Sequence, residues 1–175
     1  MNKDCMYISK YQALKIHEQL ISDYGGETGI LDEEKLISCL FQPTTSFYGH
    51  EQYPTLEEKS AVYLYSVVMF HPFMDGNKRA GYTYTVYFLK SLGASIEATS
   101  NEKITFVMDL ASNKKSLEQV IDWIKKYSSI NHISNDLNNS ESLQNYILHS
   151  TEILDWDIYN EIKSIDDVVL KKLAE

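Results

Sequence analysis

The spacing of apolar residues predicts a largely helical chain. After Ser9, which can cap a helix, apolar side chains recur at helical intervals until Gly25 and Gly26. Glycine is typical of a helix C-terminus, because it accepts the left-handed conformation that stops a helix. Asp32 can cap a second, short helix. The first 40 residues therefore predict two helices separated by a glycine-containing turn.

Capping boxes predict the starts of two later helices. Thr55 and Glu58 form one box, ahead of an apolar helix that continues to residue 70. Ser116 and Gln119 form the other. A weaker helical pattern covers 101–111 between them. Residues 41–54, FQPTTSFYGHEQYP, contain two prolines and a glycine and exceed the usual connection length, so this segment is either functional or an insertion.

Residues 81–87, GYTYTVY, give two conflicting signals. Their alternation of β-branched and aromatic residues is typical of a strand, and Asp75-Gly76 upstream is a hairpin-turn dipeptide. In contrast, the apolar span 82–92 is long for a strand, and Tyr84, Phe88 and Leu92 would share one helical face. The local pattern leaves both alternatives open.

The C-terminal quarter differs in charge from the rest. Residues 131–175 hold nine acidic residues and three lysines, a net charge of −6, whereas residues 1–130 carry the other −3 of the total −9. Residues 131–140 are rich in Asn and Ser and predict a linker, followed by amphipathic helices over 141–154 and 164–174. We therefore expect a domain over 1–130 and an acidic helical extension over 131–175, whose charges are read first as a solvated face.

Composition limits the function classes. A length of 175 residues with 43% apolar residues suits one domain with a small appendage. The net charge of −9 argues against a nucleic-acid binder. No apolar run approaches the ~18 residues of a membrane span, and the N-terminal residues lack a signal-peptide pattern, so the expected compartment is the cytoplasm. Two cysteines, Cys5 and Cys39, do not make a disulfide framework.

The stretch HPFMDGNKR, residues 71–79, combines groups that could carry chemistry. If a helix begins near Asn77, its first N–H groups and its dipole favour an anion, and Gly76 allows close backbone approach. Lys78 and Arg79 are unfavourable cations at a helix start unless an anion binds there. The stretch therefore predicts a phosphate site without a Walker loop.

Two further groups in the stretch suit phosphoryl or nucleotidyl transfer. Asp75 could hold Mg²⁺, which commonly uses one or two protein carboxylates beside substrate phosphates. His71 could take a proton from an attacking hydroxyl. Taken singly, each has a simpler explanation as a helix cap or a turn residue. The other histidines lack such neighbours and are read as structural or surface residues: His17, His50, His132 and His149.

The stretch resembles the Fic/Doc signature HxFx(D/E)GN(G/K)R, and further features over about residues 6–127 are similar to the Doc branch, the death-on-curing toxins of toxin–antitoxin modules. The resemblance implies a compact all-α bundle with the motif between two core helices and residues 41–54 as a flap before it. It implies that His71 is the base and that Asp75 holds Mg²⁺. Phosphates of ATP would meet the remaining motif residues: Phe73, Gly76, Asn77, Lys78 and Arg79.

Two positions within the resemblance indicate which phosphate is transferred. Adenylylating Fic enzymes have Gly where this chain has Lys78, and a second Arg where it has Tyr82. The Doc pattern implies transfer of the γ-phosphate to a Ser or Thr of a protein, in Doc members a translation factor. The alternatives are adenylyl transfer and a non-catalytic binding module. The self-restraining (S/T)xxxE(G/N) motif is not found, which implies a separate antitoxin or, as a sharper hypothesis, an acidic extension that covers the cationic site.

Overall fold

The computed structural model describes residues 7–130 and 153–175, and in these residues it confirms the all-α prediction. Seven α-helices are present there: α1 Lys10–Tyr24, α2 Glu33–Phe41, α3 Leu56–Phe70, α4 Asn77–Ser91, α5 Ser100–Ala111, α6 Leu117–Tyr127 and α8 Trp156–Leu173. A short 3-10 helix, Gln42–Thr44, follows α2. No helix among the described residues is long and apolar enough to cross a membrane.

Local hydrogen bonds at the predicted caps explain where the helices begin. The side chains of Ser9, Thr55 and Ser116 each accept a hydrogen bond from the backbone N–H three residues later, and each box is completed by the reciprocal contact. Thr99 and Glu102 form a fourth box at the start of α5. Each box satisfies orphan N–H groups at a helix start, so short sequence signals predicted these starts well.

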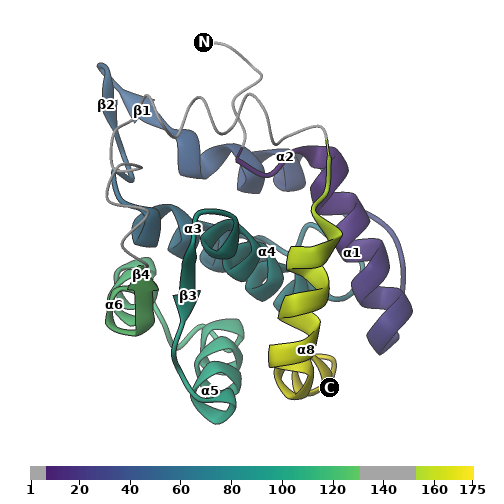
Figure 1. The fold of residues 1–175 in the computed structure, drawn as a ribbon. Coiled ribbons are helices and arrows are strands. Elements are labelled where there is room, and N and C mark those ends of the chain that lie inside the picture. Colours follow the sequence, from purple (N-terminus) through teal and green to yellow (C-terminus); the bar gives the residue numbers. More distant parts are fainter. Residues whose placement is uncertain (1–6, 131–152) are drawn as a thin grey trace.

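The centre of the molecule is the pair α3 and α4, with α2 and α6 against α3, and α1 and α8 against α4 (Figure 1). Gly81 lets the central pair approach closely. A Cβ built there would lie 3.0 Å from Val68 Cγ2 and 3.3 Å from the Leu64 carbonyl oxygen. The loop that joins α3 to α4 is residues 71–76, so the motif lies between the two best-buried helices.

The ambiguous stretch 81–87 is helical and belongs to α4. Its β-branched and aromatic residues are buried and paired on several sides. The Tyr84 hydroxyl donates to the Ala13 carbonyl oxygen at 2.7 Å, and Thr85 Oγ1 donates to the Gly81 carbonyl oxygen at 2.8 Å. Buried contacts such as that of Tyr84 with α1 thus outweigh the strand propensity of these residues.

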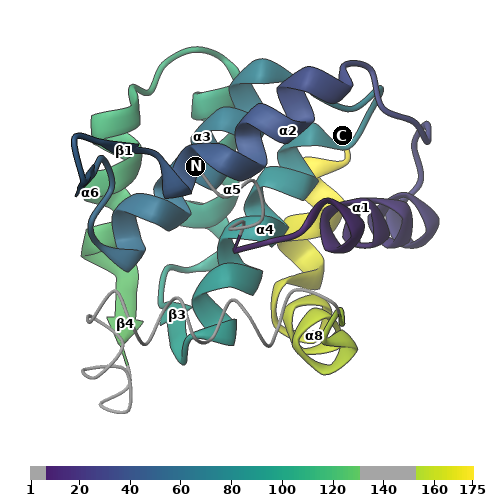
Figure 2. The ribbon, with the colours of Figure 1, turned by 90° about the horizontal axis from the view of Figure 1, so that it is seen from above.

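Two small antiparallel sheets accompany the helices. Strands β1 (Ser46–Phe47) and β2 (His50–Glu51) form a hairpin within 41–54. Its turn residues Tyr48 and Gly49 both have positive φ, 50° and 80°, as a tight hairpin turn requires. Strands β3 (Ala94–Ile96) and β4 (Ser128–Ile130) pair with Ser95 opposite Ser129 (Figure 2). The second sheet was not predicted, since three-residue strands leave little pattern.

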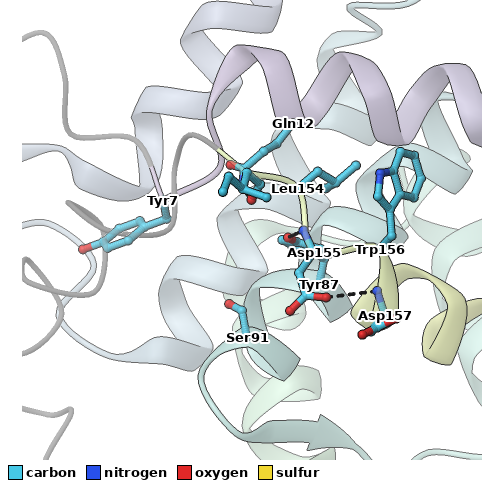
Figure 3. Close-up of a pocket in the computed structure, with 9 residues that line it drawn as sticks. Tyr7, Gln12, Tyr87, Ser91, Leu154, Asp155, Trp156 and Asp157 are labelled. Atoms are coloured by element: carbon cyan, nitrogen blue, oxygen red, sulfur yellow. Dashed lines mark hydrogen bonds between the residues drawn. The ribbon is translucent and has the colours of Figure 1, made fainter.

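Helix α8 begins at Trp156, earlier than the predicted 164–174, because Asp155 caps it. Asp155 Oδ1 accepts hydrogen bonds from the N–H groups of Asp157 (3.0 Å) and Ile158 (3.3 Å). The segment before α8 is held by Gln12, whose Nε2 donates to the Ile153 carbonyl oxygen at 3.1 Å. A cavity of about 380 Å³ opens where this segment meets Gln12 (Figure 3). The predicted linker 131–140 and most of the predicted helix 141–154 lie outside the described residues.

The inner face of α8 belongs to the core, so the extension is not only a solvated face. Its buried apolar residues are Tyr159, Ile162, Val169, Leu170 and Leu173. Asp166 is also buried, and the helix is kinked there, with φ −110° and ψ 20°. The division between a domain over 1–130 and an extension over 131–175 stays a prediction.

Candidate active site

The motif loop, residues 71–76, starts with His71 at the C-cap of α3. The backbone of His71 is left-handed, with φ 50° and ψ 61°, a conformation that few non-glycine residues adopt and that is often found at functional sites. The imidazole is exposed, and Nδ1 lies 3.4 Å from the Met69 carbonyl oxygen. The strained backbone therefore ends α3 abruptly and presents the ring to solvent.

The segment that follows α1 holds the motif loop from one side. The backbone N–H groups of Leu31 and Asp32 donate to the Pro72 carbonyl oxygen at 2.8 and 3.1 Å, and the N–H of Met74 donates to the Gly29 carbonyl oxygen at 3.0 Å. These bonds tie two segments that are far apart in the sequence. The loop is thus a fixed part of the fold, although it has no regular secondary structure.

Asn77 holds the loop from within. Its Oδ1 accepts a hydrogen bond from the Phe73 N–H at 3.0 Å, and its Nδ2 donates to the Phe73 carbonyl oxygen at 2.9 Å. Asn77 was predicted to contribute, with the amides that follow it, to an anion site. In the structure it shapes the loop, while its backbone N–H remains at the start of α4.

Phe73 and His17 form a buried pair beneath the loop. Their rings are stacked 3.8 Å apart at 8°, and His17 Nε2 lies 2.8 Å from the Asp75 carbonyl oxygen. Burial lowers the pKa of His17, so the ring is neutral near pH 7 and its Nε2–H can donate to this oxygen. Phe73 is 1% exposed, so its ring anchors the loop and does not line the surface.

His17 was read from the sequence as a structural or surface residue, without any link to the motif. The structure confirms a structural position and adds the contact with the motif loop. Its partner Asp75 lies 58 residues away in the chain, so no spacing within the sequence could have indicated the pair.

Asp75 lies in the loop with its side chain 47% exposed. Oδ1 accepts a hydrogen bond from the Gly76 N–H at 2.5 Å, and Oδ2 accepts one from the Glu27 N–H at 3.2 Å. Gly26 permits this arrangement, because a Cβ at Gly26 would lie 2.3 Å from Asp75 Oδ2. The carboxylate is therefore oriented by backbone donors while part of it stays open to solvent.

This single carboxylate fits Mg²⁺ bound mainly through phosphates and water, which is a common mode for that ion. No group of three metal-binding side chains occurs in residues 7–130 and 153–175, so a closed protein cage is not available in that part of the chain. Asp75 could therefore supply one ligand to a metal that arrives with a phosphate substrate.

Among the α-helices of the described residues, α4 differs from the others in having no side-chain cap at its start. Its N-cap is Gly76, with φ 77° and ψ 12°, and its first turn contains Lys78 and Arg79 and no acidic residue. The Lys78 ammonium lies 3.5 Å from Met108 Sδ, a weak acceptor. The helix start thus offers backbone donors, a positive dipole end and an available lysine to an anion.

Arg79 lies beneath the loop, 1% exposed. Its Nη1 donates to the carbonyl oxygens of Gly25 (2.7 Å) and Leu20 (3.4 Å), its Nη2 lies 3.7 Å from Asp75 Oδ1, and its Nε has no hydrogen-bond partner. Arg79 was predicted to contact phosphate oxygens. In the structure its guanidinium connects the end of α1 to the motif and brings positive charge under the motif loop.

Tyr82 occupies the position of the second arginine in the adenylylating pattern. It is 1% exposed, and its hydroxyl donates to Asp166 Oδ2 at 2.8 Å. Burial, followed by the effect of Asp166, raises the pKa of Tyr82 well above its usual value. This position therefore holds a neutral hydroxyl that already has a partner.

The predicted residues lie in the motif loop and the first turn of α4, with different placements. His71, Asp75, Gly76 and Lys78 surround the loop and the start of α4, whereas the side chains of Phe73, Asn77 and Arg79 point into the fold and hold it. The segment predicted as a flap, residues 41–54, contains the β1–β2 hairpin, whose aromatic tip is exposed, with Phe47 at 62% and Tyr48 at 102%.

Comparison with known proteins gives a family match and two named relatives. The model of the Fic/DOC family matches residues 7–89. The chain is 33% identical over 75 residues to the Toxin Doc of Mycolicibacterium smegmatis, covering 43% of this chain and 58% of that protein. It is 27% identical over 120 residues to the Protein kinase doc of Escherichia phage P1, covering 69% of this chain and 94% of that protein. Residues 7–89, which contain segment 41–54, the motif loop and most of α4, therefore match the Fic/DOC family.

Proposed function

We propose that this chain is an ATP-dependent protein phosphotransferase of the Doc type, which transfers the γ-phosphate of ATP to a Ser or Thr hydroxyl of a protein. One observation carries the proposal: a single loop presents the exposed imidazole of His71, the partly open carboxylate of Asp75 and the uncapped start of α4. Phosphoryl transfer needs a base, a metal carboxylate and an anion site, and it depends mainly on positioning and electrostatics.

His71 is the proposed base. If its Nδ1–H donates to the Met69 carbonyl oxygen, Nε2 keeps its lone pair for a proton. Nε2 accepts the proton of the target hydroxyl, whose oxygen forms a bond to the γ-phosphorus. The bond between this phosphorus and the β–γ bridging oxygen breaks, and ADP leaves with the electron pair.

The start of α4 is the proposed phosphate site. The N–H groups near Gly76 and Asn77 and the ammonium of Lys78 would contact phosphate oxygens, and Arg79 would add charge from beneath. Mg²⁺, when bound at Asp75, would neutralise charge on the phosphates. The side chain of Asp75 is held for this role by the N–H groups of Gly76 and Glu27.

Transfer of the γ-phosphate is favoured over adenylyl transfer by Lys78 and Tyr82. The adenylylating pattern requires a second arginine at position 82. Here this position is a tyrosine whose hydroxyl donates its hydrogen bond to Asp166. The relative named as a protein kinase supports the same choice. Adenylyl transfer is the second candidate, because the base and the anion site would serve either reaction.

The partners proposed here follow from the Doc resemblance. A translation factor is the proposed class of protein substrate, and a separate antitoxin is the proposed regulator, in line with the relative named as a toxin. A substrate of this class would place the reaction in the cytoplasm.

Labelled ATP separates the candidates. The full chain is incubated with Mg²⁺, cell lysate and ATP labelled at either the α- or the γ-phosphate. Label on protein from the γ-position alone supports the kinase, and label from the α-position supports adenylyl transfer. No label from either position would overturn both and leave a binding module. A Lys114→Ala variant, changed at an exposed lysine outside the motif, is the matched control for variants at the motif.

A further inference from the structure

Helix α8 is anchored to the body through the buried carboxylate of Asp166. Asp166 is 3% exposed. Its Oδ2 accepts a hydrogen bond from the Tyr82 hydroxyl at 2.8 Å, and its Oδ1 pairs with Lys103 Nζ at 2.7 Å. The helix departs from regular geometry at this residue. A buried carboxylate is strongly disfavoured when it loses a partner, so these two contacts fix the register of α8 against α4 and α5.

A second set of contacts joins α8 to the last two residues of α1. The carboxylate of Asp23 accepts a hydrogen bond from the Tyr159 hydroxyl at 3.0 Å and pairs with Lys163 Nζ at 2.9 Å. The Tyr24 hydroxyl donates to Asp167 Oδ1 at 3.1 Å. We call these five residues the α1–α8 junction. Because Asp166 fixes the register of α8, the junction residues of this helix are held next to the end of α1.

The chain runs from the junction directly into contacts with the motif. Gly25, next to Tyr24, accepts a hydrogen bond from Arg79 Nη1 at 2.7 Å. Two residues further on, the Glu27 N–H donates to Asp75 Oδ2 at 3.2 Å. Gly26 lies so close to Asp75 that no Cβ fits between them. A shift of the end of α1 would therefore move the atoms that hold Arg79 and Asp75.

The described part of α8 does not cover the motif. His71 is exposed and the Asp75 side chain is 47% exposed with α8 in place. Within residues 153–175, no α8 carboxylate pairs with Lys78 or Arg79. Asp166 is paired with Lys103, and Glu161 pairs with Lys90 at 2.6 Å. The hypothesis of an acidic cover thus finds no support in this part of the extension.

We propose that α8 is a positioning element for the motif, which acts through the α1–α8 junction on Gly25 and Glu27 and so on Arg79 and Asp75. Its catalytic consequence rests on the proposed function. Loosening the junction lowers transfer, because the phosphate and metal groups lose their fixed positions. A cover would have the opposite effect, since its loosening would raise transfer.

The test uses the full chain with the double variant Tyr24→Phe, Lys163→Met. It removes one hydrogen bond and one ion pair of the junction and keeps both the Tyr24 ring and the Asp166 anchor. The matched control is Glu161→Gln, which loosens a contact of α8 with α4 and leaves the junction intact. In the double variant, measured well below its Tm, we expect the Mg²⁺ concentration for half-maximal transfer to rise about tenfold, as when an outer-shell partner of a metal ligand is lost. The control should match the wild type.

Hydrogen exchange provides a readout that does not depend on transfer. Residues 25–32 should exchange faster in the double variant than in the wild type or the control. Unchanged exchange there, an unchanged Mg²⁺ requirement or increased transfer would each overturn the positioning role. If the wild-type protein transfers no label at all, the proposed function fails, whereas the exchange of residues 25–32 still decides whether α8 positions this segment.

Discussion

The two central helices, α3 and α4, have the same length and pack on each other, yet they begin in opposite ways. At the start of α3, Thr55 and Glu58 form a capping box, and acidic residues fill the first turn. At the start of α4, Gly76 provides no side-chain cap, and Lys78 and Arg79 fill the first turn. The first helix satisfies its own N–H groups and dipole. Helix α4 has no residue of its own that satisfies these N–H groups or the dipole, which is consistent with a bound anion.

Removing the exposed imidazole of the motif loop should have the largest effect. We expect His71→Ala to lower transfer about 100- to 10,000-fold, the range for loss of a general base. The measurement is the rate of label transfer from γ-labelled ATP under saturating substrate. Transfer by His71→Ala at the rate of the Lys114→Ala control would show that His71 is not the base.

Reversing the charge in the first turn of α4 tests the comparison directly. Lys78→Glu should lower transfer by at least about tenfold, the effect of losing roughly 1.4 kcal/mol of binding to phosphate. The same change should raise the free energy of unfolding by about 0.3–1 kcal/mol, because an acid suits a helix N-terminus. Denaturant unfolding and transfer assays on the same samples measure both, with Lys78→Met as the neutral control. If Lys78→Glu lowered the free energy of unfolding as well as transfer, the contrast between the two helix starts would be contradicted.

Substitutions at the start of α3 should change the stability of the protein. Thr55→Ala removes the oxygen that accepts the Glu58 N–H hydrogen bond at 3.2 Å, so we expect the free energy of unfolding to fall by about 1 kcal/mol. Thr55→Ser keeps the hydroxyl and should retain most of the stability. If both variants unfold at the same denaturant concentration, the box does not stabilise α3.

The capping box of α5 predicts a small pH effect. Hydrogen bonds from Tyr127 and Thr99 lower the pKa of Glu102 from 4.5 to about 2. Because the folded-state pKa is the lower one, this stabilisation is present above pH 4.5 and is lost as the pH falls toward 2. An NMR titration of Tyr127→Phe should show the Glu102 pKa moving up. An unchanged titration would assign the shift to the box alone.

Sequence reasoning worked where a structure depends on neighbouring residues. The boxes at Thr55 and Ser116 are complete within four positions, so the starts of α3 and α6 followed from local sequence. The motif residues are also adjacent, so their common loop could be predicted. Residues 81–87 could not be assigned locally, since the helix there depends on contacts such as that of Tyr84 with Ala13 in α1.

Sequence reasoning was limited where the partners are distant in the chain. The role of His17 depends on Asp75, and the burial of Asp166 depends on Tyr82 and Lys103. The same limit explains why Phe73, Asn77 and Arg79 were assigned to a nucleotide site without notice of their internal contacts. A motif indicates which residues gather, but the direction of each side chain is decided by the elements packed around it.

The β3–β4 pair gives the α5–α6 region a closed topology. Ala94–Ile96 and Ser128–Ile130 meet where this region leaves the body and returns, and the Glu97 N–H extends the closure by donating to the Tyr127 carbonyl oxygen at 2.8 Å. A segment whose two ends are fastened together tends to unfold as one cooperative unit. Opening that unit would remove Lys103 from Asp166 and Met108 from Lys78 in a single event, so the anchor of α8 and the edge of the motif would share one local unfolding equilibrium.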